Sequence, residues 1–316
     1  MPKYISPQLS LLGLCILSLS IFTPSICVGV NLFSGKYNGF IIESPLIPRS
    51  EIFHGGPPRD GIPSIDEPKF INHKQARFLS EDDRILGLHD GVQYKAYPIR
   101  ILNWHEIVND GNILISYCPL CGTGMAFSSV NSDFGVSGLL YNSDMLLYDR
   151  DTRSLWSQIL GQAISGKLKG TRLKLLPLEH TSWKDWSNRH PDTLVLSNNT
   201  GFSRNYSRSP YGNYARSSQQ YFPTAYKDRR FHPKEMVIGL KYKEHVKAYP
   251  FIELAKLKKS RFTDEIAGKR VIVQFSSEYR SGNIYLDSGE TIPSVTGYWF
   301  AWYAFHPDTE VFMYKD

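Results

Sequence analysis

The sequence predicts an α+β, β-rich protein made of two diverged internal repeats of one mixed strand and short-helix unit. Two pairs of matching segments predict the duplication, and each pair keeps its internal spacing. The pairs are "ILGLHDGVQYKAYP" (85–98) with "VIGLKYKEHVKAYP" (237–250), and "WKDWSNRHPDTLV" (183–195) with "WFAWYAFHPDTEV" (299–311). Because both matches occur in the same order, we expect the two copies at about 84–197 and 236–313.

Turn residues and apolar runs predict the elements of the first copy in order. Asp90-Gly91 between two short apolar runs is typical of a β-hairpin. Pro98 suits the first turn of a helix, which is predicted to continue through "IRILNWHEIVND" to Gly111. The apolar run "ILISYC" predicts a buried strand. Further β-rich segments are predicted at "MAFSSV", "FGVSGLLY", "DMLLYDR", "SLWSQ" and "RLKLLPL".

A short helix near the end of each copy is predicted to be structural. Thr181 or Ser182 is a suitable N-cap for the helix in the first copy. Its Trp183, Trp186 and His190 are spaced to lie on one helix face, and "TLVLS" follows as a strand. His190 precedes a proline, as does His306 in the second copy, which favours extended geometry and ends the helix. Because both copies share these residues, we expect them to serve packing and capping.

The N-terminus has the pattern of an export signal. Lys3 precedes an uncharged apolar run over 9–22, which is shorter than the ~20 residues of a membrane span. A signal peptide is therefore predicted over 1–27, with cleavage between about 24 and 30; a retained N-terminal membrane anchor is the alternative. The protein is expected to be periplasmic, on the cell surface or secreted.

Composition and segment boundaries define the remaining organisation. Of 316 residues, 41% are hydrophobic, which is typical of a globular protein. The net charge is +6 without a run of five basic residues, so nucleic acid is not an expected partner, nor is a membrane beyond the signal segment. The expected segments after the signal peptide are an N-terminal extension and loop (28–83), copy one (84–197), a polar connecting segment (198–235) and copy two (236–316). The connecting segment is either a covering loop or a linker.

The cysteines are the main candidates for chemistry. The chain contains Cys15, Cys27, Cys118 and Cys121. Signal cleavage would leave only the last two, both in "YCPLCGTGM". In the second copy their places are taken by Ser276 and Tyr279, so the shared unit closes without cysteines. The pair is therefore predicted to have a function of its own.

Three interpretations of the cysteine pair remain open. The first is thiol-disulfide redox chemistry with an unknown redox partner, in which one thiolate attacks, the other resolves, and His105 from the preceding helix assists thiolate formation. The second is a metal site, in which Cys118 and Cys121 with Met125 or His105 bind a soft ion such as Cu(I), or zinc, received from an unknown metal donor. The third is an extracellular interaction module with an inert disulfide.

Other features are found in one copy only: Trp104-His105-Glu106, Thr123-Gly124-Met125, the loop "HGGPPRDGIP" at 54–63 and the polar run at 141–158. The charged residues of this run include Asp144, Asp149, Arg150, Asp151 and Arg153. Alternating charges beside turns predict a solvated, salt-bridged hairpin; the alternative is a polar wall beside the thiols. The motifs of nucleotide-binding enzymes, serine hydrolases and zinc proteases are missing, so those classes are not supported.

Several long motifs resemble a known family. They are "GGPPRDGIP", "KAYPIRILNWHEIVND", "ISYCPLCGTGMAF", "FGVSGLLYNSDMLLYDRDTRSLWSQ", "LPLEHTSWKDWSNRHPDTLVLS" and "YWFAWYAFHPDTEVF". From about residue 50 to the end, the chain resembles the exported bacterial and archaeal proteins of domain-of-unknown-function family 3179. That family has no established activity. Some members carry selenocysteine in this cysteine motif, so the resemblance implies redox chemistry at Cys118 and Cys121.

Overall fold

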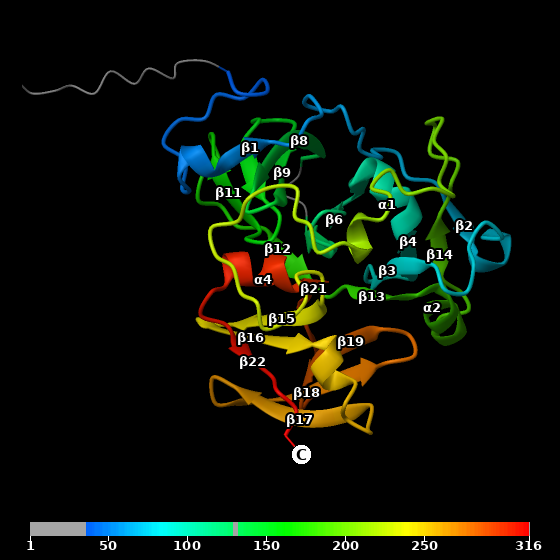
Figure 1. The fold of residues 1–316 in the computed structure, drawn as a ribbon. Coiled ribbons are helices and arrows are strands. Elements are labelled where there is room, and N and C mark those ends of the chain that lie inside the picture. The colour runs from blue at the N-terminus through cyan, green and yellow to red at the C-terminus, as the bar shows by residue number, and fades with distance from the viewer. Residues whose placement is uncertain (1–35, 129–131, 316) are drawn as a thin grey trace, which may run out of the picture. The chain divides into compact units, whose positions relative to one another are not determined.

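The computed structural model describes residues 36–128 and 132–315, which form a β-rich fold with few short helices (Figure 1). The predicted signal segment lies outside the described residues. Within the described part of the chain the strands form four sheets, each antiparallel or mixed. The prediction of a β-rich fold is therefore confirmed.

Two sheets surround the cysteine motif. The first has the order β1-β8-β9-β10-β11, and the second has the order β22-β16-β15-β21-β7-β6-β5, with β12 beside β7. The strands of the first are β1 (Ile52–His54), β8 (Phe134–Tyr141), β9 (Asp144–Asp149), β10 (Leu155–Ser157) and β11 (Gln162–Ser165). Those of the second are β5 (Ile107–Asp110), β6 (Ile113–Cys118), β7 (Thr123–Ser128), β12 (Lys174–Leu176), β15 (Met236–Tyr242), β16 (His245–Pro250), β21 (Val295–Tyr298) and β22 (Glu310–Val311).

The other two sheets lie beside these. The third has the order β13-β3-β4-β14-β2, and the fourth β17-β18-β19-β20. Their strands are β2 (Phe70–Asn72), β3 (Arg84–His89), β4 (Tyr94–Pro98), β13 (Glu179–Ser182), β14 (Leu194–Leu196), β17 (Arg261–Ile266), β18 (Lys269–Ser276), β19 (Ser281–Leu286) and β20 (Thr291–Ile292). The helices are α1 (Ile99–His105), α2 (Trp183–Arg189), α3 (Phe251–Leu254) and α4 (Trp299–Phe305), with 3-10 turns η1 (Arg49–Glu51), η2 (His73–Gln75) and η3 (Tyr214–Arg216).

Most elements expected in the first copy are confirmed, but the first helix is shorter than predicted. The hairpin β3–β4 and the strand β6 form as expected. Helix α1 ends at His105, because Glu106 adopts a left-handed conformation with φ of 59°. The β-branched residues Ile107 and Val108 then pair with β6 instead of continuing the helix. The prediction of a helix up to Gly111 is therefore wrong for its second half.

The two Trp-bearing helices have equivalent surroundings. The indole of Trp186 in α2 packs on Gly87 of β3, and that of Trp302 in α4 packs on Gly239 of β15, so closely that a Cβ on either glycine would overlap the ring. Each indole N–H donates to a threonine, at 2.9 Å and 3.0 Å respectively. After each helix a strand pairs in parallel with the preceding hairpin, β14 with β4 and β22 with β16.

The helix ends behave as the sequence predicts. Ser182 caps α2 by accepting the N–H of Asp185 at 3.3 Å. His190 and His306 are the C-cap residues of α2 and α4, and both have extended φ values, −132° and −136°. These histidines therefore stand where each helix stops, as their position before proline indicates.

The hairpin that contains the cysteine turn and the hairpin β18–β19 each contact the strand that precedes the Trp helix in the other half of the chain. Strand β7, which follows the cysteines, pairs with β21 at Gly124 opposite Thr296. In the other direction, β19 contacts β13. The turns are also alike: residues 119–122 connect β6 to β7, and 277–280 connect β18 to β19. The cysteine turn therefore lies where the N-terminal and C-terminal halves of the described chain meet.

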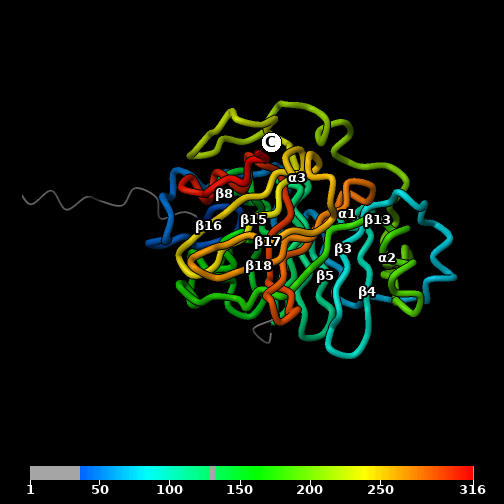
Figure 2. The backbone as a smooth tube through the Cα atoms, turned by 90° about the horizontal axis from the view of Figure 1, so that it is seen from below, coloured from blue at the N-terminus to red at the C-terminus, as the bar shows by residue number. Residues whose placement is uncertain are grey.

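The polar segment 198–235 covers part of this junction. Figure 2 shows it, in yellow-green, running along the outer edge of the molecule. Tyr214 from this segment is buried in the same hydrophobic cluster as both cysteines, with Tyr211 and Phe222 packed against it. The covering-loop interpretation therefore agrees with these contacts.

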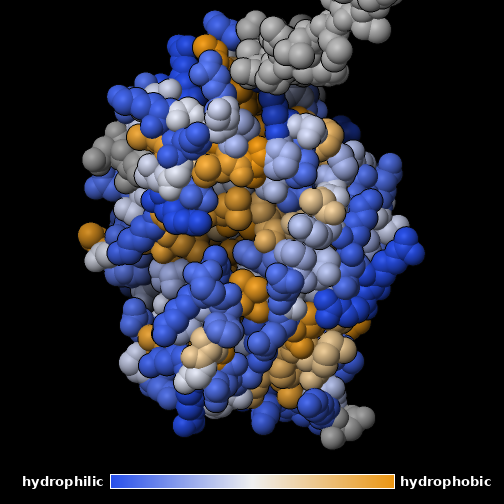
Figure 3. Space-filling model, turned by 90° about the vertical axis from the view of Figure 1, so that its left-hand side faces the viewer, coloured by the Kyte–Doolittle hydropathy of each residue, from blue (hydrophilic) through white to orange (hydrophobic). Residues whose placement is uncertain are grey.

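The exposed surface carries both hydrophobic and hydrophilic side chains. On the face in Figure 3, hydrophobic groups gather in a patch surrounded by hydrophilic ones. Among the described residues, no helix combines the length and the hydropathy needed to cross a bilayer.

Candidate functional site: a buried dithiol beside an aspartate

The sequence C-P-L-C-G forms a tight turn at the end of a buried strand. Cys118 is the last residue of β6, and its carbonyl accepts the N–H of Cys121 at 3.2 Å. Gly122 follows with a φ of 62°, and a Cβ there would lie 2.9 Å from the ring of Tyr298. Only glycine suits both constraints. Strand β7 then starts at Thr123, opposite Cys118.

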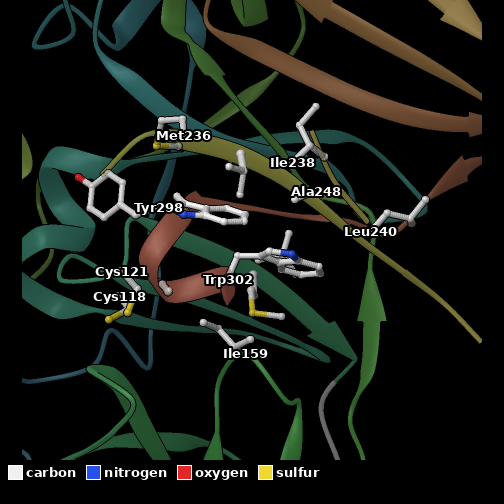
Figure 4. Packing of buried hydrophobic residues seen from close by; sticks show 14 of the residues in the cluster. Cys118, Cys121, Ile159, Met236, Ile238, Leu240, Ala248, Tyr298 and Trp302 are labelled. Atoms are coloured by element: carbon white, nitrogen blue, oxygen red, sulfur yellow. The ribbon is translucent and has the colours of Figure 1, made fainter. Parts of the chain in front are cut away.

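Strand β21, from the C-terminal half of the chain, holds this turn in place. The N–H of Tyr298, at the end of β21, donates to the carbonyl of Cys121 at 2.8 Å. Figure 4 shows the two cysteine side chains lying beside one another, near Tyr298 and the helix that carries Trp302. The exposed fraction is 1% for Cys118 and 0% for Cys121, so both thiols are inside the fold.

Asp144 joins the two cysteines from a different sheet. It is the first residue of β9 and follows Asn142 and Ser143, which both have left-handed conformations. This turn brings the carbonyl of Ser143 to the Cys121 thiol, which donates to it at 3.3 Å. The two sulfur atoms and a carboxylate oxygen of Asp144 all lie within 4.8 Å of one another. Among the described histidines, cysteines and acids, no other group of three is placed to share an ion.

The carboxylate of Asp144 is only half satisfied. Its Oδ2 accepts the N–H of Ile159 at 3.1 Å, and Oδ1 is buried without a hydrogen bond of ordinary geometry from the described residues, although the Met145 N–H and both thiols lie close enough to favour the charged carboxylate. Burial raises the pKa of Asp144 to about 7 and raises the pKa of both thiols, most strongly that of Cys121. Three groups that would repel one another as anions are therefore enclosed without a counter-charge.

The other predicted site residues lie in different surroundings. His105 is buried, with Nδ1 2.8 Å from the carbonyl of Pro63 and Nε2 2.7 Å from the hydroxyl of Tyr206. Both ring nitrogens are thus engaged, and burial lowers the pKa of this histidine. Met125 lies on β7 opposite Ser116 and is buried in the same hydrophobic cluster as the cysteines. The structure brings the two cysteines together with Asp144, and His105 is not in that group.

Glu106 is a further acid beside the site. The sequence did not identify it as an individual candidate. It is 5% exposed and accepts a hydrogen bond from the hydroxyl of Tyr211 at 2.6 Å. Burial raises its pKa to about 7. Its carboxylate also contributes to raising the pKa of Cys118. The available signal was its place in "WHE", a segment without a counterpart in the second copy.

The prediction of a solvated hairpin at 141–158 is wrong for its two central acids. Asp144 and Asp149 are both 0% exposed. Asp149 accepts hydrogen bonds from Thr152, Ser154 and the Trp156 indole, so it closes a turn. The alternative of a polar wall beside the thiols describes Asp144 correctly. The sequence did not reveal this, because charged residues in a buried turn follow the same sequence pattern as charged residues in an exposed turn.

Cys118 and Cys121 are not disulfide-bonded. Together with the fold, they define a class of β-rich protein in which a C-x-x-C turn and an aspartate are enclosed at one place. The chain belongs to the family described as "Protein of unknown function (DUF3179)", whose model matches residues 59–287. This confirms the resemblance seen in the sequence motifs. No curated protein and no solved structure was found to match the chain.

Proposed function

We propose that Cys118, Cys121 and Asp144 bind a divalent metal ion, with zinc as the best fit. The supporting observation is the cluster itself: two sulfurs and a carboxylate oxygen within 4.8 Å of one another, with Oδ1 of Asp144 lacking a hydrogen bond of ordinary geometry from the described residues. Thiolate and carboxylate are both ordinary zinc ligands. Cu(I) prefers soft ligands alone, so the aspartate favours zinc over copper.

Electrostatics supports the same proposal. Burying a carboxylate and two thiolates together is unfavourable unless a cation compensates them. A divalent ion supplies that compensation and favours the deprotonated ligands. Three protein ligands also leave one of zinc's four usual positions for another molecule, where the ion would act as a Lewis acid.

Metal analysis of the purified protein tests the proposal. We expect about one zinc per chain by elemental analysis, and a loss of affinity of at least about tenfold in Cys118→Ser and in Asp144→Asn. Asp149→Asn is the matched control, because Asp149 is equally buried but bonds to its own turn and to the Trp156 indole of β10, away from the thiols. Retention of a stoichiometric metal by the double variant Cys118→Ser/Cys121→Ser would show that the ion binds elsewhere.

Thiol-disulfide exchange is the second candidate, because the two thiols are adjacent and reduced in a C-x-x-C turn. Their burial and raised pKa values oppose it, since the thiolate is the attacking form and needs access to its target. Thiol counting of metal-free protein equilibrated with glutathione buffers tests it. A reversible loss of both thiols at a defined potential would support redox chemistry with a partner still to be identified.

We further propose that the chain is a diverged duplication and that it is exported. The equivalent Gly–Trp packing, the parallel strand after each Trp helix and the equal turn lengths support the duplication. Export rests on the apolar N-terminal run alone. Mass spectrometry of the mature protein tests it: cleavage between about 24 and 30 is expected, whereas an attached Cys15 would indicate a membrane anchor.

A further inference from the structure

A pocket of about 370 Å³ lies against the cysteine turn. Pro119 and Gly122 of that turn contribute to its wall, as does Arg280 from the corresponding turn of the second copy. Tyr214 and Arg216 contribute from the covering segment 198–235. The volume falls within the usual range for small-molecule sites, and junctions between structural units are common places for them.

The charge around this pocket is entirely positive. Four cations contribute to its lining, namely Arg84, Arg216, Lys234 and Arg280. No carboxylate among the described residues lines it. None of the four cations forms an ion pair within the described part of the chain. Asp185 and Glu179 act on Arg84, and Glu235 interacts with Arg280, only from beyond ion-pair distance, so the pocket keeps an excess of positive charge.

Two of these cations are fixed by backbone carbonyls. The guanidinium of Arg84 donates to the carbonyls of Tyr279, His180 and Arg280 at 2.5, 2.8 and 2.9 Å. The ammonium of Lys234 donates to three carbonyls of the covering segment. Burial lowers the pKa of Lys234 to about 8, as expected for a cation without a counter-charge. The three carbonyls of the covering segment use all three N–H donors of Lys234, so Lys234 would act on a ligand through its charge alone, whereas hydrogen bonds to a head group would come from Arg216 and Arg280.

Two polar groups of the lining residues have no partner in the described structure. They are Nδ1 of His180 and the hydroxyl of Tyr214, on side chains that are 6% and 2% exposed. Buried polar groups are normally hydrogen-bonded, so such atoms need an explanation. Beside them, Ile99, Met236 and Phe251 provide an apolar part of the wall.

We propose that this pocket binds a small organic anion, with a carboxylate or phosphate head group facing the cations and an apolar body against the hydrophobic wall. Arginine forks suit either head group, and the unpartnered imidazole and phenol offer further hydrogen bonds. The ligand would lie against the turn that carries the cysteines. Binding rests on the cations and the wall, and does not require a metal on the thiols.

Calorimetric titration of protein treated with a chelator tests the proposal. The probes are phenyl phosphate and benzoate. Inorganic phosphate tests the anionic head group without an apolar body, and benzyl alcohol tests the apolar body without a charge. All are measured at one ionic strength. Saturable binding of an aromatic anion is expected, weaker binding of inorganic phosphate, and none of benzyl alcohol. Failure of both aromatic anions to bind, or equal binding of benzyl alcohol, would overturn the proposal.

Paired variants locate the site. Arg216→Gln/Arg280→Gln removes the two cations whose side chains have no hydrogen bond to a carbonyl of the described residues, and should weaken anion binding by at least about tenfold while the fold is kept. Arg270→Gln is the control, because Arg270 is an exposed arginine outside the pocket that pairs with Asp287. An equal loss of anion affinity in Arg270→Gln would show that the anion is attracted by the general surface charge, and would refute a specific site in the pocket.

The cysteine variants separate this inference from the proposed metal site. Cys118→Ser/Cys121→Ser should bind the anion as the unaltered protein does, whether or not the latter carries zinc. Anion binding that appears only with zinc and disappears in the cysteine variant would place the ligand on the metal, and would refute the pocket as the binding site.

Discussion

Replacing Glu106 by glutamine should stabilise the metal-free protein, and increasingly so as the pH rises. Glu106 is enclosed beside the cysteine turn, and the one hydrogen bond recorded for its carboxylate comes from Tyr211. Burial raises its pKa from 4.5 to about 7. Between these two values the folded protein keeps a proton that the unfolded chain releases, so the stability of the folded state falls as pH rises.

The size of the effect follows from the pKa change. One pH unit corresponds to about 1.4 kcal/mol, so the free energy of unfolding should lose roughly 3 kcal/mol between pH 4.5 and pH 7, and no more above that. Glu106→Gln keeps the size of the side chain and an oxygen that accepts from Tyr211, but it carries no charge. The variant should therefore exceed the unaltered protein by roughly 3 kcal/mol at pH 8 and by less than about 1 kcal/mol at pH 5.

Urea unfolding in the presence of a chelator measures this difference at the two pH values. The control is Glu253→Gln. Glu253 is 4% exposed, but its carboxylate pairs with Lys256 at 2.7 Å and accepts the N–H of Tyr314 at 3.1 Å. Losing that charge should cost about 1–3 kcal/mol at pH 8. If the gap between Glu106→Gln and the unaltered protein were the same at pH 5 and pH 8, the assigned electrostatic cost of Glu106 would be wrong.

Two further predictions concern the structural frame of the site. Gly87→Ala and Gly239→Ala should each destabilise the protein by about 1–3 kcal/mol in chemical unfolding, because the added Cβ overlaps an indole ring; unchanged stability in either would mean that the ring can move aside. Ser182→Ala should cost about 1 kcal/mol, because its hydroxyl accepts the Asp185 N–H at the start of α2. Tyr298 at the same place in α4 makes no such side-chain bond, so Tyr298→Phe should leave that helix end unchanged.

Local patterns in the sequence predicted the elements that depend on local causes. The Asp90-Gly91 turn, the Ser182 cap and the histidines before proline each act within a few residues, and each is found where the sequence indicates. The end of the first helix was missed because Glu106 has no residue-type signal for a left-handed conformation. The strand at Ile107 forms because it finds a partner in β6, which is a tertiary effect.

The composition of the site depended on contacts that no local pattern encodes. Cys118 and Cys121 were found because they lack counterparts in the second copy. Asp144 reaches them only because the β8–β9 hairpin, in a different sheet, packs against the cysteine turn. His105 was expected there because it precedes the strand that carries the cysteines. Its ring instead meets Pro63 and Tyr206, since its direction at the helix end is set by packing rather than by distance along the chain.

A duplication would also explain why the turn that carries the cysteines and a turn that carries a cation contribute to one pocket. The turns 119–122 and 277–280 each connect two antiparallel strands, and both contribute to the wall through Gly122 and Arg280. The first turn carries the cysteines, whereas the second carries a cation and is held by Arg84. In this interpretation each copy keeps the turn that the fold needs and adds a different chemistry to it. Such a division needs both copies in one chain, because neither turn alone offers a metal site and an anion site that adjoin.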